Sequence, residues 1–495
     1  MTHTLNGAPI LVVGAGIMGI GIAQVAAQAG HTVMLFDTRD GAVTEGRDKL
    51  AKTLDTLLAK GKLRAEEAAQ TLSRIEAIGA LEEAASARLV VEAIVENLAI
   101  KRGLFQQLEA IVAPDCVLAT NTSSISVTAI ANGLQHPQRL VGMHFFNPVP
   151  LMKLVEVVSG LQPDPAAAAA IFDLSLVWGK VPVHARSTPG LIVNRIARPY
   201  YAETLALLLE QAATPAVLDA CLRAAGFRMG PCELMDLIGH DTNLAVTQSV
   251  YEANFFDKRF VPSLVQREMV DGGLLGRKSG RGFFAYGDGA AAATPESIES
   301  MPLPTAKLLR LHGQGPLAEG FATALEKTGQ AFLRVQASDW LGLEVDGAQL
   351  RLTDGRPASQ LGAEVAVFDL PRLVGKGAAL AWAPSLRASP AWTGTAARWL
   401  AALDFKPQRV ADTPGLVVAR TLAMLINEAA DAVQQGVCTP EGADAAMKLG
   451  VNYPAGPFEW LAQWNAPAVI ALLDTLDAHY RGERYRVSPW LRKFV

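Results

Sequence analysis

Short runs of hydrophobic residues, many of them β-branched, alternate with longer helical stretches over residues 1–188. Strands that alternate with helices are typical of a mainly parallel sheet joined by crossover helices. The pattern therefore predicts a Rossmann-type α/β domain over this part of the chain. The expected strands are residues 10–13, 32–37, 89–93, 117–120, 140–144 and 154–158.

The pattern changes at Thr188-Pro189-Gly190, and hydrophobic residues then recur at the spacing of a helix through Leu209. This change predicts an all-α domain over residues 189–287, with helical stretches at 214–225 and 233–271. Residues 288–305 are mostly small, contain proline and offer no packing face, which is typical of an interdomain linker.

An internal repeat indicates how the second half is built. The sequence TPGLIVNR at 188–195 recurs as TPGLVVAR at 413–420, and GPCEL at 230–234 recurs as GPFEW at 456–460. A nearly constant offset of 225 to 226 residues predicts a duplicated helical domain over residues 413–495.

Residues 306–412 lie between the linker and the second helical copy. They precede the second copy in the same way that the first α/β domain precedes the first copy. We expect no glycine-rich dinucleotide motif there and interpret the segment as a degenerate, shortened α/β remnant. The two helical copies also differ in candidate chemistry, because Asn194 becomes Ala419. Asn194 is therefore not needed to build its helix, and a functional use is expected.

A glycine-rich turn follows the first predicted strand. Gly14 permits a tight turn, Gly16 lets the backbone approach a pyrophosphate, and Gly19 lets the helix pack on the strand. Asp37 ends the second strand, where a carboxylate binds ribose hydroxyls and repels a 2′-phosphate. The motif favours NAD over NADP, although Arg39 nearby weakens the exclusion. A glycine-rich turn without any ligand is the alternative.

His144 ends a predicted strand at the sheet edge where open α/β sheets bind ligands. Glu156 lies on the next strand, where its carboxylate could hold the second imidazole nitrogen and suit the ring to act as a general base. Ser123, in the sequence NTSS, ends another strand at this edge and could bind a substrate oxygen. The sequence NTSS is also typical of an ordinary turn or helix N-cap, which is the alternative interpretation.

Composition narrows the class of protein. A length of 495 residues predicts two to four domains, and a formal net charge of −4 without a basic block argues against nucleic acid and membrane surfaces as partners. The hydrophobic stretches are too short or too charged to span a bilayer, and the N-terminus leaves no room for a signal peptide. The four cysteines lie far apart without a CxxC pair, which predicts reduced thiols, a cytoplasmic location and no metal site.

Seven motifs in order resemble the L-3-hydroxyacyl-CoA dehydrogenase family over roughly residues 1–287. They are VVGAGIMG, VVEAIVEN, NTSS, HFFNPVPLMKLVEV, TPGLIVNR, GPCELMDLIGHD and KSGRGFFAY. The resemblance implies a reversible, NAD-dependent oxidation of (S)-3-hydroxyacyl-CoA to 3-oxoacyl-CoA.

The resemblance also implies a role for individual residues. His144 would be the general base, oriented by Glu156, while Ser123 and Asn194 would bind the substrate oxygen. The residues implied in NAD binding are Gly14, Gly16, Met18, Gly19, Asp37, Glu96, Lys101, Ser123 and Asn147. Thr53 and Lys60 match positions that contact coenzyme A, in a stretch with a local excess of lysine.

The part beyond residue 287 is similar to longer members of the family, among them dehydrogenases of phenylacetate breakdown that oxidise 3-hydroxyadipyl-CoA. A role in aromatic or fatty-acid β-oxidation-type catabolism follows as an expectation. Arg186, Arg195 and Arg198 are candidates for binding a distal carboxylate of such a substrate.

We expect the second helical copy to cover the apolar face of the first as an internal pseudo-dimer. Trp460, Leu461 and Trp464 are candidates for the buried face. The chain would then be a monomer, with a homodimer as the alternative. Two other functions stay open: a dehydrogenase of a free hydroxy acid or sugar acid, and a non-catalytic NAD-binding scaffold.

Overall fold

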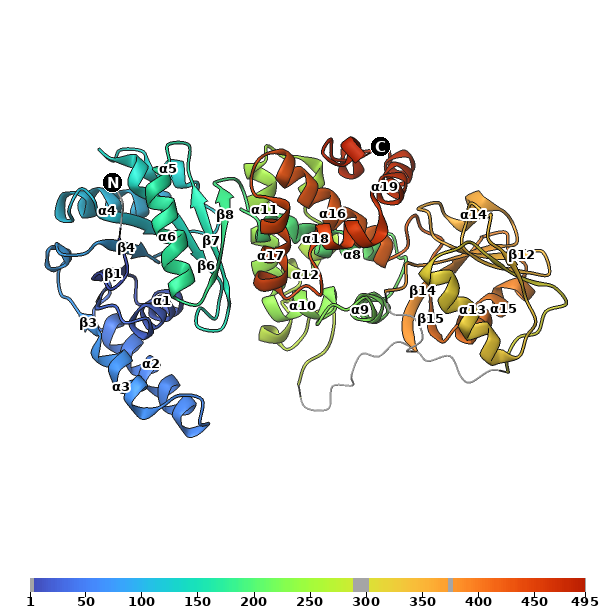
Figure 1. The fold of residues 1–495 in the computed structure, drawn as a ribbon, viewed down its shortest axis with the longest axis horizontal. Helices are drawn as coiled ribbons and strands as arrows, with labels where there is room; N and C mark the ends of the chain where they lie inside the picture. Colours follow the sequence, from blue (N-terminus) through green and yellow to red (C-terminus); the bar gives the residue numbers. More distant parts are fainter. Residues whose placement is uncertain (1–3, 288–301, 373–376, 495) are drawn as a thin grey trace. The chain divides into compact units, whose positions relative to one another are not determined.

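The computed structural model describes residues 4–287, 302–372 and 377–494, so most of the predicted linker lies outside the described residues. The chain forms two compact units (Figure 1). The first contains the residues up to Arg195 together with Gln435–Val451, and the second contains Ile196–Gln434 together with the residues from Asn452 onward. A short segment of the second helical copy therefore belongs to the first unit.

The first unit is built on an eight-stranded sheet with the order β3-β2-β1-β4-β5-β6-β7-β8. Its strands are β1 Ile10–Val13, β2 Val33–Phe36, β3 Ile75–Ala77, β4 Leu89–Glu92, β5 Val117–Thr120, β6 Leu140–Phe145, β7 Leu154–Ser159 and β8 Val181–Arg186. The pairs from β3 to β6 are parallel, β7 runs antiparallel to β6, and β8 is parallel to β7. This sheet confirms the predicted Rossmann-type class.

The six expected strands are all present, with small shifts at their ends, whereas β3 and β8 were not predicted. Both are edge strands of the sheet. Only one of the three residues of β3 is buried, and β8 contains Pro182 and several exposed residues. Edge strands tolerate proline and carry a weaker hydrophobic pattern, so they left little signal.

The helices of the first unit lie around its sheet (Figure 1), and some of them share a hydrophobic core with the strands. They are α1 Ile17–Gln28, α2 Ala42–Ala59, α3 Ala65–Ser73, α4 Leu98–Ile111, α5 Val127–Ala131, α6 Pro165–Val177, the short α7 Val193–Ile196, and α17 Pro440–Val451. Asn97 and Asp164 cap α4 and α6 by accepting backbone N–H hydrogen bonds. Helix α1 has Gly16 at its N-cap and no side-chain cap, which leaves its first N–H groups for another acceptor.

The second unit contains the helices of both copies. They are α8 Arg198–Leu209, α9 Pro215–Ala224, α10 Pro231–Ile238, α11 His240–Ala253, α12 Leu264–Asp271, α16 Val418–Gln434, α18 Pro457–Trp464 and α19 Ala466–Tyr480. The helical stretch expected at 233–271 is divided into α10, α11 and α12, and the first division comes at Gly239, which adopts a φ of +97°. A second break follows at Phe255 and Phe256, which both have positive φ.

Residues of the predicted remnant form a seven-stranded mixed sheet with the order β10-β9-β11-β12-β13-β14-β15. Its strands are β9 Leu309–His312, β10 Leu333–Val335, β11 Gly342–Val345, β12 Ala348–Leu352, β13 Val365–Phe368, β14 Ala378–Pro384 and β15 Phe405–Arg409. The helices in this segment are α13 Pro316–Thr328, α14 Ala358–Leu361 and α15 Pro390–Ala402.

The expectation that this segment lacks a dinucleotide-type glycine motif is wrong. Gly313 and Gly315 stand between β9 and α13 with the spacing of Gly14 and Gly16, and Ala318 occupies the third position. Alanine is an accepted residue there. However, Pro316 removes an N–H group from the first turn of α13, so this turn offers fewer donors to a phosphate than α1 does.

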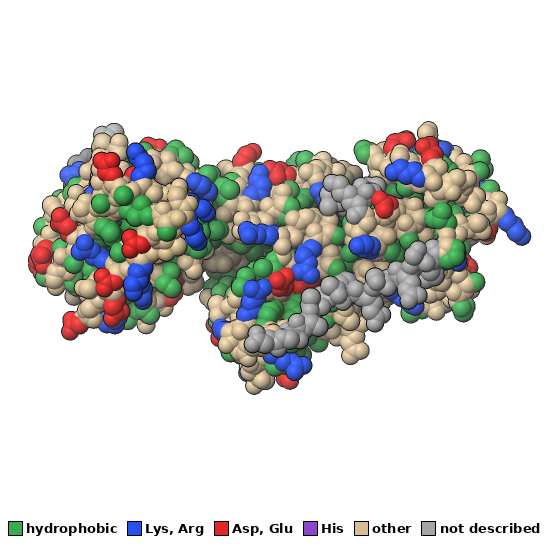
Figure 2. All heavy atoms as spheres, turned by 90° about the horizontal axis from the view of Figure 1, so that it is seen from below, with side chains coloured by type: hydrophobic (Ala, Val, Ile, Leu, Met, Phe, Trp, Pro, Cys, Tyr) green, Lys and Arg blue, Asp and Glu red, His purple; other side chains and the backbone are tan. Residues whose placement is uncertain are grey.

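On the face drawn in Figure 2, basic and acidic side chains of the described residues are interspersed. Among the described helices, none is long and apolar enough to cross a membrane.

Candidate active site

The glycines of the turn after β1 are of two kinds: two are closely packed against backbone, and one has free space beside it. A Cβ added to Gly14 would lie 2.5 Å from the carbonyl oxygen of Ala93, and one added to Gly19 would lie 1.7 Å from that of Gly14. Either side chain would displace backbone. A Cβ on Gly16, by contrast, would meet no atom within 4 Å, so the start of α1 is open to a ligand. These features fit the pyrophosphate of a dinucleotide.

A cavity of about 560 Å³ lies beside this turn. Its lining includes four of the predicted contact residues: Gly16, Asp37, Thr53 and Asn147. Lys60 does not line it and ends α2 as its C-cap. The cavity has the size and the donor and acceptor groups for part of a nucleotide. The contacts predicted for Thr53 and Lys60 with coenzyme A stay predictions.

Asp37 is held in place by two backbone donors. Its Oδ2 accepts from the N–H of Ala15 at 2.8 Å, and its Oδ1 accepts from the N–H of Arg39 at 2.8 Å. The Arg39 guanidinium is itself engaged by Glu45 through two hydrogen bonds of 3.1 and 2.9 Å. The hydrogen bond and charge of Arg39 lower the pKa of Glu45. The cation beside the ribose position is therefore paired with a carboxylate, which offsets its attraction for a 2′-phosphate.

Sequence reasoning missed Glu92, a fully buried carboxylate that ends β4. One of its oxygens accepts from Lys101 Nζ at 2.6 Å and from the N–H of Ile94, and the other accepts from Thr120 Oγ1 at 2.7 Å. The ammonium of Lys101 also lies 3.1 Å from Glu96, and the lysine is only 1 % exposed. The available signal was an acidic residue directly after the apolar run of β4. Lys101 is thus a buried partner of Glu92 and Glu96, and its predicted contact with NAD stays a prediction.

Glu96 fixes the turn that carries Ser123. Its Oε1 accepts from Thr122 Oγ1 at 2.5 Å and from the N–H groups of Ser123 and Ser124 at 3.0 and 3.1 Å. Burial alone would raise the pKa of Glu96, but the hydrogen bond from Thr122 and the charge of Lys101 outweigh it and lower the pKa. An ionised Glu96 therefore holds the serine turn at the end of β5.

The predicted histidine–carboxylate pair forms across β6 and β7, where His144 lies directly opposite Glu156 in the antiparallel register. His144 Nδ1 is 2.6 Å from Glu156 Oε2. The other carboxylate oxygen accepts from the N–H groups of Ile192 and Val193 at 3.1 and 3.0 Å. Glu156 is fully buried and His144 is 6 % exposed. The carboxylate occupies Nδ1, so Nε2 is the nitrogen available to a substrate.

The same hydrogen bonds bring Asn194 to the site, because it directly follows Val193 in the segment that Glu156 holds. The serine turn is tied to the histidine strand as well, since Asn121 Oδ1 accepts from the N–H of Phe145 at 2.9 Å. The four residues predicted to be catalytic therefore stand on segments joined by hydrogen bonds. Their catalytic roles stay predictions.

The second sheet offers an internal comparison for this pair. At the 225-residue offset of the repeat, His144 corresponds to Asp369 and Glu156 to Ala381, and the N–H of Asp369 donates to Ala381 O at 2.9 Å. The Asp369 carboxylate accepts from the N–H groups of Val417, Val418 and Ala419. Burial raises the pKa of Asp369 to about 6 in spite of these donors. The second copy therefore keeps a carboxylate that caps the helical segment and has no imidazole.

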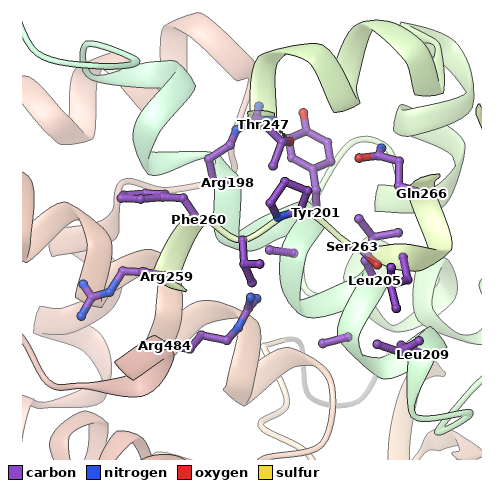
Figure 3. A pocket seen from close by; sticks show the side chains of 15 residues that line it. Arg198, Tyr201, Leu205, Leu209, Thr247, Arg259, Phe260, Ser263, Gln266 and Arg484 are labelled. Atoms are coloured by element: carbon purple, nitrogen blue, oxygen red, sulfur yellow. Dashed lines mark hydrogen bonds between the residues drawn. The ribbon is translucent and has the colours of Figure 1, made fainter. Parts of the chain in front are cut away.

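Two of the three arginines proposed for a distal carboxylate are engaged elsewhere. Arg186 Nη1 lies 3.4 Å from Gln435 O, and Arg195 Nη1 donates to Gln435 Oε1 at 2.8 Å. Arg198 lines a mainly apolar cavity of about 150 Å³ in the second unit (Figure 3). Its Nη1 donates to Thr247 Oγ1 at 3.1 Å, and burial lowers its pKa.

Comparison with known proteins gives the same order of domains. Residues 9–188 match the model described as 3-hydroxyacyl-CoA dehydrogenase, NAD binding domain. The model of the 3-hydroxyacyl-CoA dehydrogenase C-terminal domain matches both 190–286 and 415–495. Residues 350–414 match a 3-hydroxybutyryl-CoA dehydrogenase reduced Rossmann-fold domain.

Individual relatives extend this result along the chain. The 3-hydroxyadipyl-CoA dehydrogenase of Escherichia coli K12 is 42% identical over 99% of this chain and 98% of its own length. A probable 3-hydroxybutyryl-CoA dehydrogenase of Deinococcus radiodurans is 43% identical over 56% of this chain and 99% of its own length.

A crystal structure of 3-hydroxybutyryl-CoA dehydrogenase from Escherichia coli K12 is 41% identical, with a TM-score of 0.89 over 99% of this chain and 98% of that chain. Likeness of sequence and fold thus extends over almost the whole chain. The protein belongs to the 3-hydroxyacyl-CoA dehydrogenase family, and the NAD-dependent oxidation of 3-hydroxyacyl-CoA is the reaction that these relatives support for it.

Proposed function

We propose that His144 is the general base of this dehydrogenase and that Glu156 orients it. The observation that carries the proposal is the 2.6 Å contact between His144 Nδ1 and Glu156 Oε2. A fixed carboxylate on Nδ1 selects the tautomer whose Nε2 has a free lone pair, as a base requires. Glu156 is itself held by two backbone N–H groups, so the carboxylate that positions the imidazole is fixed in place.

In this mechanism Nε2 of His144 removes the proton from the C3 hydroxyl of the substrate. A bound NAD⁺ would supply the hydride acceptor for C3, and the reverse reaction would use the same groups. The first turn of α1 and Asp37 would hold the cofactor. Ser123 and Asn194 would donate hydrogen bonds to the substrate oxygen, where negative charge develops in the transition state. The product is a 3-oxoacyl-CoA.

We infer that the substrate carries a distal carboxylate, as 3-hydroxyadipyl-CoA does. The support is the name of the Escherichia coli relative that is similar along its whole length. The structural relative of the same length is named for 3-hydroxybutyryl-CoA, which makes a short-chain substrate the second candidate. Phenylacetate or other aromatic catabolism is the pathway proposed for the first case, and fatty-acid β-oxidation-type catabolism for the second.

We also infer that the second helical copy replaces the second subunit of a dimer, so that the chain is a monomer. Within the second unit, Glu203 of the first copy pairs with Arg484 of the second, and Arg259 of the first pairs with Glu428 of the second. The two glutamates and the two arginines are each 225 residues apart. Such a reciprocal pair is the signature of an isologous, two-fold interface.

Aromatic packing supports the same inference. Trp460 is 1 % exposed and Leu461 is 8 % exposed, while Trp464 is only partly buried. The ring of Trp460 lies 5.7 Å from that of Phe227 in the first copy. Large aromatic side chains at the centre of such a contact contribute much of its stability. A cytoplasmic location is proposed as well, because none of the four cysteines forms a disulfide.

Replacing His144 by alanine tests the base. We expect kcat to fall by about 10² to 10⁴-fold, the usual contribution of a general base, with the Kd for NADH nearly unchanged. Steady-state turnover of acetoacetyl-CoA and fluorescence titration of NADH measure the two quantities. His184→Ala is the control, because His184 is an exposed histidine on β8 of the same sheet. Equal turnover with and without the His144 imidazole would contradict the mechanism.

Selectivity for NAD over NADP is tested at Asp37 and Glu45. We expect Asp37→Ser to weaken NADH binding and strengthen NADPH binding, because it removes the carboxylate from the ribose. Adding Glu45→Ala frees Arg39 for the 2′-phosphate and should improve the Kd for NADPH further, by a few-fold at most, because an exposed ion pair is weak. Fluorescence titration measures both cofactors. Glu67→Ala, which breaks a comparable exposed pair with Arg64, should change neither value.

A matched pair of thioesters tests the distal carboxylate. We expect a higher kcat/KM for 3-oxoadipyl-CoA than for 3-oxohexanoyl-CoA, which has the same chain length without the terminal charge. NADH oxidation is followed at 340 nm, with acetoacetyl-CoA as the short-chain reference and free acetoacetate as the control for the carrier. A preference for acetoacetyl-CoA would instead favour the short-chain substrate. Equal turnover of free acetoacetate would favour the alternative of a dehydrogenase for free acids, and binding of NADH without any turnover would favour a scaffold.

The mass in solution tests the internal pseudo-dimer. We expect light scattering after size exclusion to give the mass of one chain for the full-length protein. A truncation after residue 287 should dimerise or aggregate, because it exposes the aromatic face around Phe227. A well-behaved monomeric truncation would refute the pseudo-dimer, as would a stable dimer of the full chain.

A further inference from the structure

Helix α17 belongs to the second copy by sequence but packs in the first unit, against β7 and β8. Its counterpart at the 225-residue offset is α9 of the first copy, which packs in the second unit against β14. Strand β14 in turn occupies the repeat position of β7. Helix α9 of the first copy thus packs on the second sheet, and helix α17 of the second copy packs on the first sheet, which carries the His144–Glu156 pair.

The chain leading into α17 is bonded to both ends of the segment that carries Asn194. The N–H of Arg186, at the end of β8, donates to Val437 O at 2.8 Å. Beyond the turn, Arg195 Nη1 donates to Gln435 Oε1 at 2.8 Å. These two contacts bracket residues 187–194 on either side. A backbone carbonyl and a side chain of the second copy therefore restrain this part of the active site.

Gly450, in the last turn of α17, brings the helix close to the same segment. A Cβ added there would lie 2.8 Å from Leu154 Cδ2 and 2.9 Å from Val193 Cγ2. Leu154 precedes Glu156 by two residues on β7, and the N–H of Val193 is one of the two donors to Glu156 Oε1. The backbone of α17 thus packs directly on the residues that hold the carboxylate.

We propose that residues 435–451 of the second copy are a positioning element of the active site in the first. By packing on Leu154 and Val193, α17 keeps the N–H of Val193 on Glu156 Oε1 and thereby keeps Oε2 on His144. Glu156 is fully buried, so no water can replace a donor that moves away. The proposal rests on the proposed role of His144 as the base.

The magnitude of the effect follows from geometry. A displacement of about 1 Å at a catalytic group can cost about 10²-fold in rate, even when the change lies far from the chemistry. The atoms nearest to an added Cβ at Gly450 belong to Leu154 and Val193, so we expect a substitution there to act on Glu156 through these two residues. Its effect should therefore fall on kcat rather than on cofactor binding.

The repeat supplies a matched control position. Ala225 corresponds to Gly450, and it lines a small cavity together with Ala379 and Val418, the counterparts of Leu154 and Val193. The sheet at this position carries Asp369 and Ala381 in place of the histidine and glutamate. Valine can thus be introduced at both repeat positions, only one of which adjoins the His144–Glu156 pair.

The experiment compares Gly450→Val with Ala225→Val in the full-length protein. Acetoacetyl-CoA turnover gives kcat and KM, fluorescence titration gives the Kd for NADH, and thermal unfolding gives the Tm. We expect Gly450→Val to lower kcat by at least about tenfold with the Kd for NADH unchanged, and Ala225→Val to keep wild-type kcat. Equal kcat values for the two variants would overturn the proposal.

Two further variants cover the case in which valine at Gly450 prevents folding. Gly450→Ala adds only the Cβ, and alanine is otherwise the better residue inside a helix, so a threefold or larger loss of kcat without a lower Tm supports the proposal. Val193→Ala combined with Gly450→Val removes two of the three methyl groups that lie nearest to the added Cβ, the third being Leu154 Cδ2. We expect this pair to recover kcat to that of Val193→Ala alone, a coupling that a general loss of stability would not produce. Additive losses would overturn the proposal.

The outcomes also separate this proposal from the mechanism beneath it. A fully active Gly450→Val protein, together with an inactive His144→Ala protein, removes the positioning role and leaves the base in place. A His144→Ala protein as active as the wild type removes both.

Discussion

The active-site geometry depends on one buried carboxylate that has two partners. Glu156 gives one oxygen to the imidazole of His144 and the other to the N–H groups of Ile192 and Val193. A fully buried charge is tolerated only when its hydrogen bonds are satisfied, so the strand pair and the helical segment must meet in one arrangement. The constraint that builds the fold here is the same one that orients the proposed base.

In the second sheet, a carboxylate holds the helical segment but orients no imidazole. Asp369 stands at the repeat position of His144 and caps three backbone N–H groups, while Ala381 stands at the position of Glu156. The second sheet therefore keeps a carboxylate that caps the helical segment, although it has no histidine at this position. A carboxylate thus holds the helical segment at this junction in both sheets, whereas the histidine that we propose as the base stands only in the first.

The sequence predicted the parts of the site that follow from local pattern. The six strands were found because buried strands are continuous apolar runs. The pairing of His144 with Glu156 was expected because the two residues lie on consecutive strands, and the structure adds the antiparallel register that places them opposite each other. Glu92 was missed because its partners, Lys101 and Thr120, come from other elements. The place of α17 could not be predicted, since a hydrophobic pattern shows which face is buried and not which sheet covers it.

The fusion of two copies in one chain explains why the two copies have the same residue at some equivalent positions and different residues at others. Glu203 and Glu428 are both retained, and so are Arg259 and Arg484, because a two-fold contact uses each residue type on both sides. Active-site residues are under no such constraint, and Asn194 has become alanine in the second copy. A separate subunit could not diverge in this way, since every change would enter both active sites of a homodimer. Covalent linkage removes that symmetry, so one copy can lose its chemistry and still keep its packing surface, together with the positioning role that we propose for α17.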